Sequence, residues 1–128
     1  MAAAMHPWLA EFIQHIEAQQ LPTAPPAVGV LNDIELFDVF ESQLWSRLLD
    51  LQSRLMQAQG QSFYTIGSSG HEANAAIAKA LRVTDPAFLH YRSGAFFIQR
   101  AKQLPGSTPL YDLLLSFAAS ADDPISAG

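Results

Sequence analysis

Arg92 lies in a short segment whose residue types could bind an anion. The segment Tyr91, Arg92, Ser93, Gly94 ends the apolar run 87–91, for which we expect a short buried strand. It also precedes an expected helix, and the amino end of a helix can hold phosphate through free N–H groups and a partial positive charge. Arg92 adds a planar, permanently charged fork. The segment therefore predicts either an anion site or a surface salt bridge from Arg92 to a carboxylate.

A second helix start lies at the Gly-Ser-Ser-Gly turn of residues 67–70, before an alanine-rich run that ends at residue 81. Ser69 and Glu72 have the spacing of a capping box, in which each side chain bonds to the backbone N–H of the other residue. Glu72 could instead be a general base. The small side chains of this run would let its backbone approach a neighbouring helix or a ligand closely.

Two further pairs of residues could contribute to a site. His71 and His90 could pair as metal ligands, but no third ligand stands at helical or hairpin spacing, so the sequence predicts no metal site within this chain. Phe63 and Tyr64 could line a pocket. Core packing is the alternative for Phe63, and a buried Tyr64 would need a partner for its hydroxyl.

Amphipathic helices must position these residues. Apolar residues recur at three- and four-residue spacing over residues 7–19 and 33–59, and shorter helices are expected over residues 95–103 and from Thr108 onward. Residues 61–67 read as a short extended segment. Prolines in residues 21–30 mark a connector, so the chain divides into residues 1–30 and 31–128.

The helix of residues 33–59 gives the strongest local signal. Asn32 and Glu35 form a capping-box-like start, and Gly60 is a suitable stop. Its apolar residues cover more than one side, which indicates a helix that is central in a fold or lies at an interface. They are Leu36, Phe37, Phe40, Leu44, Trp45, Leu48, Leu51, Leu55 and Met56.

The composition excludes several classes of protein. The 128 residues carry a net charge of −5, which disfavours nucleic acid as a partner. No cysteine is present, so disulfides and thiolate metal sites are excluded, and a reducing cytoplasm is favoured. No apolar run is long enough to span a bilayer. Charged residues make up only 15%, so we expect another chain, or a missing part of the protein, to cover part of the surface.

The order of the motifs resembles the α-type half of a thiamine diphosphate-dependent 2-oxo acid dehydrogenase E1 component, most closely the bacterial form with fused α and β halves. The resemblance covers roughly residues 36–128. It is carried by Gly-His-Glu-Ala at residues 70–73 and Tyr-Arg-Ser-Gly at residues 91–94. Many relatives have Gln in place of His71, and Asp-His after Arg92.

This resemblance implies an α/β fold, here a mostly helical fragment with one or two short strands, and thiamine diphosphate as cofactor. It implies that Tyr91 and Arg92 contact the diphosphate, and that Phe63, Tyr64, Ser69 and His71 lie near the substrate. The implied partners are a β-type half, a lipoyl-bearing E2 acyltransferase and a 2-oxo acid, with a branched-chain acid favoured. The parent enzyme would be a cytoplasmic homo-oligomer without nucleic acid or membrane partners.

One family motif is missing. Such enzymes hold Mg²⁺ and the diphosphate with Gly-Asp-Gly followed by Asn, and the chain contains no Gly-Asp-Gly. The glutamate that activates the cofactor belongs to the β-type half. We therefore expect a truncated, N-terminal fragment of the enzyme that holds no catalytic residue and is inactive alone. The alternative is a non-enzymatic helical module that binds a partner through its apolar helix faces.

Overall fold

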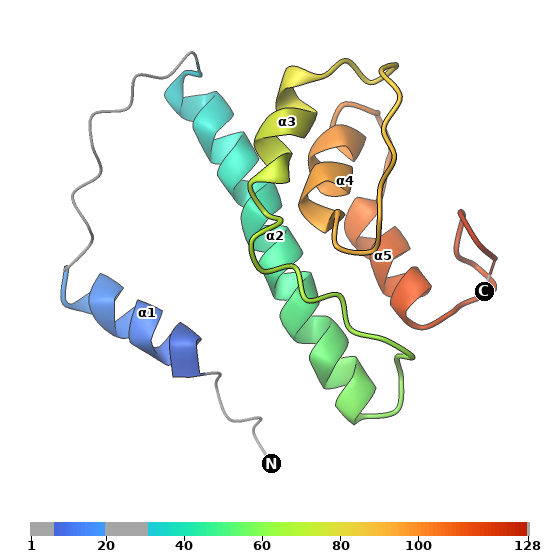
Figure 1. Cartoon of the computed structure of the whole chain (residues 1–128), viewed down its shortest axis with the longest axis horizontal. Coiled ribbons are helices and arrows are strands. Elements are labelled where there is room, and N and C mark those ends of the chain that lie inside the picture. The colour runs from blue at the N-terminus through green and yellow to red at the C-terminus, as the bar shows by residue number, and fades with distance from the viewer. Residues whose placement is uncertain (1–6, 20–30, 128) are drawn as a thin grey trace. The chain divides into compact units, whose positions relative to one another are not determined.

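The computed structural model of the chain describes residues 7–19 and 31–127. The connector expected over residues 21–30 lies outside this part of the chain. The chain divides into two compact units, Met1–Val30 and Leu31–Gly128, and each is described by itself. The first unit contains helix α1, Pro7–Glu17, which begins at the proline as the sequence predicts (Figure 1).

Helix α2, Asp33–Ala58, is the long element of the second unit, and three shorter helices pack against it (Figure 1). These are α3, Asn74–Ala80, α4, Gly94–Ala101, and α5, Pro109–Phe117. Helices α2 and α4 each contact the three other helices of this unit, so both are central to it. No helix in the described part of the chain combines the length and the apolar character that a bilayer span requires.

Both ends of α2 follow from the sequence, and both predictions are confirmed. The N–H of Glu35 donates to Asn32 Oδ1 at 3.0 Å, and the N–H of Asn32 donates to Glu35 Oε2 at 3.1 Å, which completes the capping box. After the helix, Gly60 has a φ of +71°, a left-handed conformation that favours glycine. Local sequence therefore determines where α2 begins and ends.

The prediction of an α/β fold with one or two short strands is wrong. Helices are the only regular elements of the described residues, which contain no strand. A strand needs a neighbouring strand to accept its ladder hydrogen bonds, and neither of the two predicted extended segments has one among the described residues. In residues 61–67, the N–H of Gly67 donates to the Asp50 side chain. Residues 87–91 also fail the prediction of burial, since Phe88 is fully exposed.

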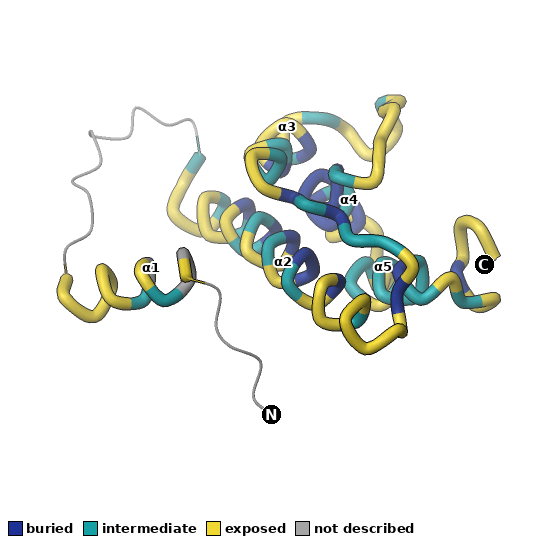
Figure 2. The backbone as a smooth tube through the Cα atoms, turned by 60° about the horizontal axis from the view of Figure 1, so that its bottom comes forward, coloured by how far each residue is buried: buried dark blue, intermediate teal, exposed yellow. Residues whose placement is uncertain are grey.

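The buried residues of α2 lie along one side of the helix (Figure 2). Most of them are small or polar, whereas most of the large apolar residues of α2 are exposed. Small side chains allow a close approach of helices: a Cβ added to Gly94 at the start of α4 would lie 3.2 Å from Ser46 Oγ. The buried residues of α2 are Val39, Ser42, Ser46, Leu49, Asp50 and Ser53. Those exposed by 39–82% are Ile34, Leu36, Phe37, Phe40, Leu44, Trp45, Leu48 and Leu55.

Two small hydrophobic clusters fill the interior of the second unit. One joins α2, α4 and α5 and is supported at its edge by Tyr64 and Met56, while the other joins α2, α3 and α4. The buried members of the first are Leu49, Ile66, Ile98 and Phe117, and those of the second are Val39, Ala75 and Ala95. The alanines let α3 and α4 pack closely, as the alanine-rich sequence predicts for a neighbouring helix.

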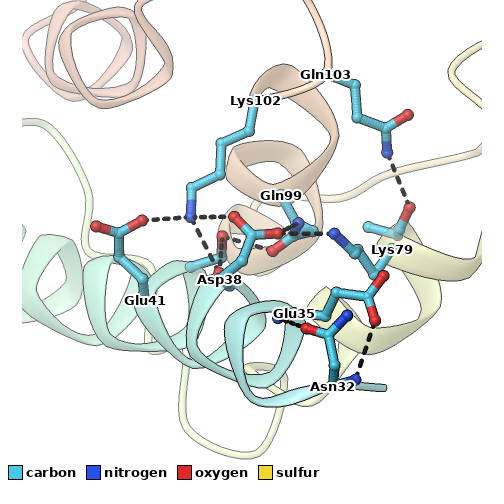
Figure 3. A network of polar contacts seen from close by, with 10 residues as sticks. Asn32, Glu35, Asp38, Glu41, Lys79, Gln99, Lys102 and Gln103 are labelled. Carbon is cyan, nitrogen blue, oxygen red and sulfur yellow. Dashed lines mark hydrogen bonds and ion pairs between the residues drawn. The ribbon is translucent and has the colours of Figure 1, made fainter. Parts of the chain in front are cut away.

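A polar cluster around Asp38, here called the Asp38 clamp, ties α2 to α3 and α4 (Figure 3). Asp38 Oδ2 accepts from Gln99 Nε2 at 2.7 Å and from Lys79 Nζ at 3.1 Å. Lys102 Nζ donates to Asp38 Oδ1 at 3.2 Å and to Glu41 Oε2 at 2.6 Å. Burial raises the pKa of Asp38, but hydrogen bonds from Gln99, Lys79 and Lys102 outweigh it and hold that pKa below its ordinary value.

Candidate functional site

Two loops, residues 67–72 before α3 and residues 90–93 before α4, meet in what we call the two-loop site. Arg92 Nη1 donates to the carbonyl oxygen of Gly67 at 3.1 Å. The rings of His71 and His90 pack edge to face, with 5.2 Å between centroids. Three of the residues predicted for the site, His71, Tyr91 and Arg92, are therefore brought together by contacts between the two loops. The fourth, Ser69, lies in the first loop, where its Oγ accepts from Arg47 Nη2 at 3.1 Å.

Asp50 of α2 forms the floor of the two-loop site. Its carboxylate is buried, and it accepts from the backbone N–H groups of Gly67 at 3.1 Å and Ser68 at 3.2 Å. Arg54 Nε donates to Oδ1 at 3.1 Å, and Arg47 Nη1 donates to Oδ2 at 3.4 Å. A buried charge requires such partners. The carboxylate therefore fixes the turn whose carbonyl receives Arg92.

Glu72 closes the 67–72 loop on itself and does not form the expected capping box. Its carboxylate accepts from the Gly70 N–H at 2.8 Å and from Ser68 Oγ at 2.9 Å, and it pairs with Arg47 Nη2 at 2.5 Å. Helix α3 begins only at Asn74 and has no side-chain cap. The structure therefore gives Glu72 a positioning role in the loop, since both of its oxygens already have partners.

Arg92 and the start of α4 present several donors to one region. Arg92 Nε donates to the Tyr91 hydroxyl at 3.1 Å, and its guanidinium lies 5.1 Å from the centre of the Tyr91 ring. Ser93 gives α4 no side-chain cap, because its Oγ accepts from the His90 N–H at 3.3 Å. The first turn of α4 therefore has no side-chain acceptor for its amides, but its residues Gly94, Ala95 and Phe96 are buried. The donor that the site presents most openly is the half-buried Arg92 guanidinium. This arrangement suits a phosphate or another oxyanion.

The structure does not bring Phe63 and Tyr64 into the two-loop site. Phe63 is 80% exposed, and its N–H points to the Phe117 carbonyl at 3.4 Å. Tyr64 packs edge to face on Phe117, with 5.7 Å between ring centroids, and its hydroxyl pairs with Ser116 Oγ at 3.1 Å. Tyr64 has the hydroxyl partner that the sequence required, but that partner belongs to α5.

Sequence reasoning missed Arg47 and the part that Asp50 plays in the site. The sequence pairs Asp50 with Arg54 one helical turn away, and the structure contains that pair, yet Asp50 also bonds to residues 67 and 68. A signal does exist. Ser42, Ser46, Asp50 and Ser53 follow helical spacing through an otherwise apolar helix, which indicates a polar face turned toward a loop or helix of the same protein.

The described residues contain no group of three or more His, Asp or Glu side chains that could hold a metal ion. His71 and His90 meet ring to ring, and His90 Nδ1 accepts from the Arg92 N–H at 3.1 Å. The chemistry that these residues can perform is thus the binding of an anion by a guanidinium and backbone amides. Comparison of the chain with family models, with curated proteins and with solved structures finds no match.

Proposed function

We propose that this chain is part of a thiamine diphosphate-dependent 2-oxo acid dehydrogenase E1 component, in which Tyr91 and Arg92 bind the diphosphate. The resemblance at residues 70–73 and 91–94 is the basis of this proposal. The observation that supports it is the position of Arg92, held on the Gly67 carbonyl beside the uncapped start of α4. A surface salt bridge, the other interpretation of Arg92, is not found, since Arg92 takes part in no ion pair with a described carboxylate.

The residues of the two-loop site would divide the work of binding. Arg92 Nη1 is fixed by Gly67, so the remaining edge of the guanidinium can face a phosphate oxygen. The Tyr91 hydroxyl accepts from Arg92 Nε, which leaves its own proton for the ligand. The first turn of α4 consists of buried residues, so Arg92 and Tyr91 would supply most of the contacts to the ligand. Asp50 would act at a distance by holding the turn at Gly67.

The reaction itself needs groups that this sequence does not carry. Thiamine diphosphate supplies the carbanion-stabilising chemistry by which a 2-oxo acid is decarboxylated. The chain has no Gly-Asp-Gly motif, and its described residues hold no metal cluster, so we assign the Mg²⁺ ligands to other residues. A β-type half and a lipoyl-bearing E2 acyltransferase are the proposed partners, with a branched-chain 2-oxo acid as substrate. Ser69 and His71 would lie at the entrance, and the proposed compartment is the cytoplasm.

A titration of the purified chain with thiamine diphosphate and with inorganic diphosphate tests the anion site. Arg92→Ala should weaken binding of both ligands by about ten- to a hundredfold, because a charge-assisted contact contributes about 1.5–3 kcal/mol. Arg92→Lys should restore only part of the affinity, since an ammonium lacks the fork. Arg82→Ala is the matched control, because Arg82 is a highly exposed arginine paired with Asp85.

Melting curves measured without ligand separate lost binding from lost folding. Equal affinities for wild type, Arg92→Ala and Arg92→Lys, or an equal loss in Arg82→Ala, would refute the site. Binding of inorganic diphosphate without any preference for thiamine diphosphate would support an anion site and contradict the cofactor assignment. We also expect no 2-oxo acid dehydrogenase activity from the chain alone, and turnover by the purified chain would contradict that expectation.

A second candidate function is a non-enzymatic module that binds a partner through an apolar helix face. The exposed apolar residues of α2 favour it, because monomeric proteins seldom expose a continuous apolar patch of this kind. The two functions differ in their ligands and are compatible in one chain. The Arg92→Ala titration tests the diphosphate site and has no bearing on partner binding through the helix face.

A further inference from the structure

We propose that the exposed apolar face of α2 binds the same face of a second copy of the chain, with the two helices antiparallel. This inference goes beyond the proposed enzyme and does not depend on it. We call the surface the α2 stripe and define it by seven positions at alternating three- and four-residue spacing: Ile34, Phe37, Glu41, Leu44, Leu48, Leu51 and Leu55.

The spacing of the α2 stripe is that of a coiled coil. Apolar residues that recur every 3.5 residues on average form a seam that keeps facing a second helix along its whole length. The stripe holds this spacing from residue 34 to residue 55, with one polar position at Glu41. Helices that only cover a globular core carry a wider and less regular apolar face. The pattern therefore points to a helical partner.

The rest of the unit packs on the other side of α2. Five of the stripe residues are exposed, with Ile34 at 82% and Phe37 at 68%, while Glu41 and Leu51 are half-buried. Ser42, Ser46 and Ser53 on the opposite face are fully buried. Helices α3, α4 and α5 contact that polar face (Figure 2). Small polar residues of α2 therefore pack inside the unit, and its large apolar residues stay available for contact with a surface outside the unit.

The charges of α2 favour a second copy in antiparallel orientation. The four carboxylates outside the buried floor, Asp33, Glu35, Asp38 and Glu41, all precede residue 42, while both arginines follow residue 46. Asp38 and Glu41 already pair with lysines of the same unit. Asp33 and Glu35 therefore carry most of the acidic charge that a second copy would meet. Parallel pairing would place the acidic half against another acidic half. Antiparallel pairing places it against the half that contains Arg54, whose side chain is 54% exposed. Antiparallel helix dipoles also attract.

The size of the surface fits a dimer. Helix α2 has 26 residues, so it is about 39 Å long at ~1.5 Å per residue. The exposed apolar side chains of the α2 stripe, together with Phe40 and Trp45, leave on the order of 600 Å² accessible, if a large side chain offers ~150–250 Å² when fully exposed. A standard protein interface buries about 800 Å² on each partner. The α2 stripe and its neighbours Phe40 and Trp45 thus approach the area that a stable dimer needs.

The stripe also defines a register. In antiparallel coiled coils, a residue at heptad position a of one helix packs beside a residue at position d of the other. The seven stripe residues alternate between these two positions. The register that pairs Phe37 with Leu55 of the second copy also pairs Leu44 with Leu48 and places Ile34 opposite Ala58. Glu41 then faces Leu51 of the second copy, and this single polar position would reduce stability while restricting the register.

Sedimentation equilibrium of the full chain tests the dimer. Wild type should show a reversible monomer–dimer equilibrium. Phe37→Glu should weaken dimerisation at least about a hundredfold, because each dimer loses two buried aromatic side chains. Phe88→Glu is the matched control: Phe88 is fully exposed and lies outside α2, so its substitution should leave the equilibrium unchanged. Circular dichroism should show that both variants stay folded.

Single cysteines test the orientation, and the chain has no native cysteine to interfere. A mixture of Phe37→Cys and Leu55→Cys chains should form the mixed disulfide in preference to either symmetrical one, as shown by mass spectrometry. Preferred symmetrical disulfides would indicate parallel pairing and overturn the proposal. A wild type that stays monomeric up to the highest concentration, or a control that dissociates as readily as Phe37→Glu, would overturn it as well. Neither result would affect the diphosphate site.

Discussion

Arg92 and Gly67 are joined by a hydrogen bond of 3.1 Å from Nη1 to the carbonyl oxygen, although 25 residues separate them. The bond links the loop before α4 to the loop before α3. Gly67 has a φ of +54°, and a Cβ added there would lie 3.4 Å from Arg92 Nη1. Gly67 thus permits both the left-handed backbone of the turn and the close approach of the Arg92 guanidinium.

Asp50→Asn should destabilise the second unit and loosen the two-loop site. The amide keeps one acceptor oxygen for Gly67 or Ser68 but loses the charge that Arg47 and Arg54 contact. We expect a loss of about 2–3 kcal/mol, as for hydrogen bonds to a charged group. Urea unfolding measures it, with Asp122→Asn as an exposed control. A change in the free energy of unfolding below about 0.5 kcal/mol would mean that the 67–72 loop does not depend on the Asp50 carboxylate.

Removing the Ser46 hydroxyl should stabilise the protein. Ser46 Oγ is buried and has no hydrogen-bond partner among the described residues, and a buried unsatisfied hydroxyl costs about 1–3 kcal/mol. Ser46→Ala should therefore raise the free energy of unfolding by about 1 kcal/mol. A decrease would show that the hydroxyl has a partner after all.

Gly94→Ala should destabilise the protein, because Gly94 and Ser46 lie in close contact. The new Cβ would meet Ser46 Oγ at 3.2 Å, and overpacking of this kind costs about 1–3 kcal/mol, against a gain of about 0.5–1 kcal/mol from helix propensity. The double variant Ser46→Ala with Gly94→Ala should be more stable than the sum of the two single changes. Thermal melts of the four proteins give this coupling, and strict additivity would argue against the contact.

The sequence predicts well those elements whose ends are determined by residues close to them in the chain. The capping box at Asn32 and Glu35, the glycine after α2 and the proline at the start of α5 act within a few residues, and the structure contains each of them. The expected strands were wrong because a strand depends on a neighbour that local pattern does not reveal. Residues 61–67 and 87–91 form no strand and have no strand beside them among the described residues.

The candidate site shows the same division between local and distant causes. Arg92 was found because a guanidinium before a helix start is a local signal. Asp50 was missed because its main partners, Gly67 and Ser68, lie 17 and 18 residues away. Helix periodicity showed that α2 is apolar on more than one side, but packing decides which side is buried. Here serines occupy that side, because α4 approaches closely at Gly94.

The Asp38 clamp should make stability depend on pH. The pKa of Asp38 is held below its ordinary value of 3.8, against the effect of burial, by Gln99, Lys79 and Lys102. A carboxylate with a lowered folded pKa stabilises the protein in full above the unfolded pKa, and that contribution is lost as pH falls below it. Asp38→Asn should therefore be less stable than wild type near pH 6, and the difference should shrink as pH falls toward about 3.

Unfolding curves of wild type, Asp38→Asn and the exposed control Asp122→Asn at the two pH values measure this difference. Glu41 shares Lys102 with Asp38, so Glu41→Gln is needed to assign the pH dependence to the correct carboxylate. A gap between wild type and Asp38→Asn that stays constant over the range would show that the clamp acts through shape alone and not through charge.

Glu41→Leu should strengthen the proposed dimer. Glu41 is the single polar position in the α2 stripe, and in the antiparallel register it faces Leu51 of the second copy. Leucine there would add an apolar layer on each chain, at about 1.5–3 kcal/mol for a fully buried side chain, so dimerisation should tighten by at least about tenfold. Lys102 would keep Asp38 as its partner, so the monomer should lose little stability. Sedimentation equilibrium compares Glu41→Leu with Gln43→Leu, a control on α2 outside the stripe. Tightening by Gln43→Leu alone would place the contact on another face of α2. No tightening by either variant would contradict the register in which Glu41 faces Leu51.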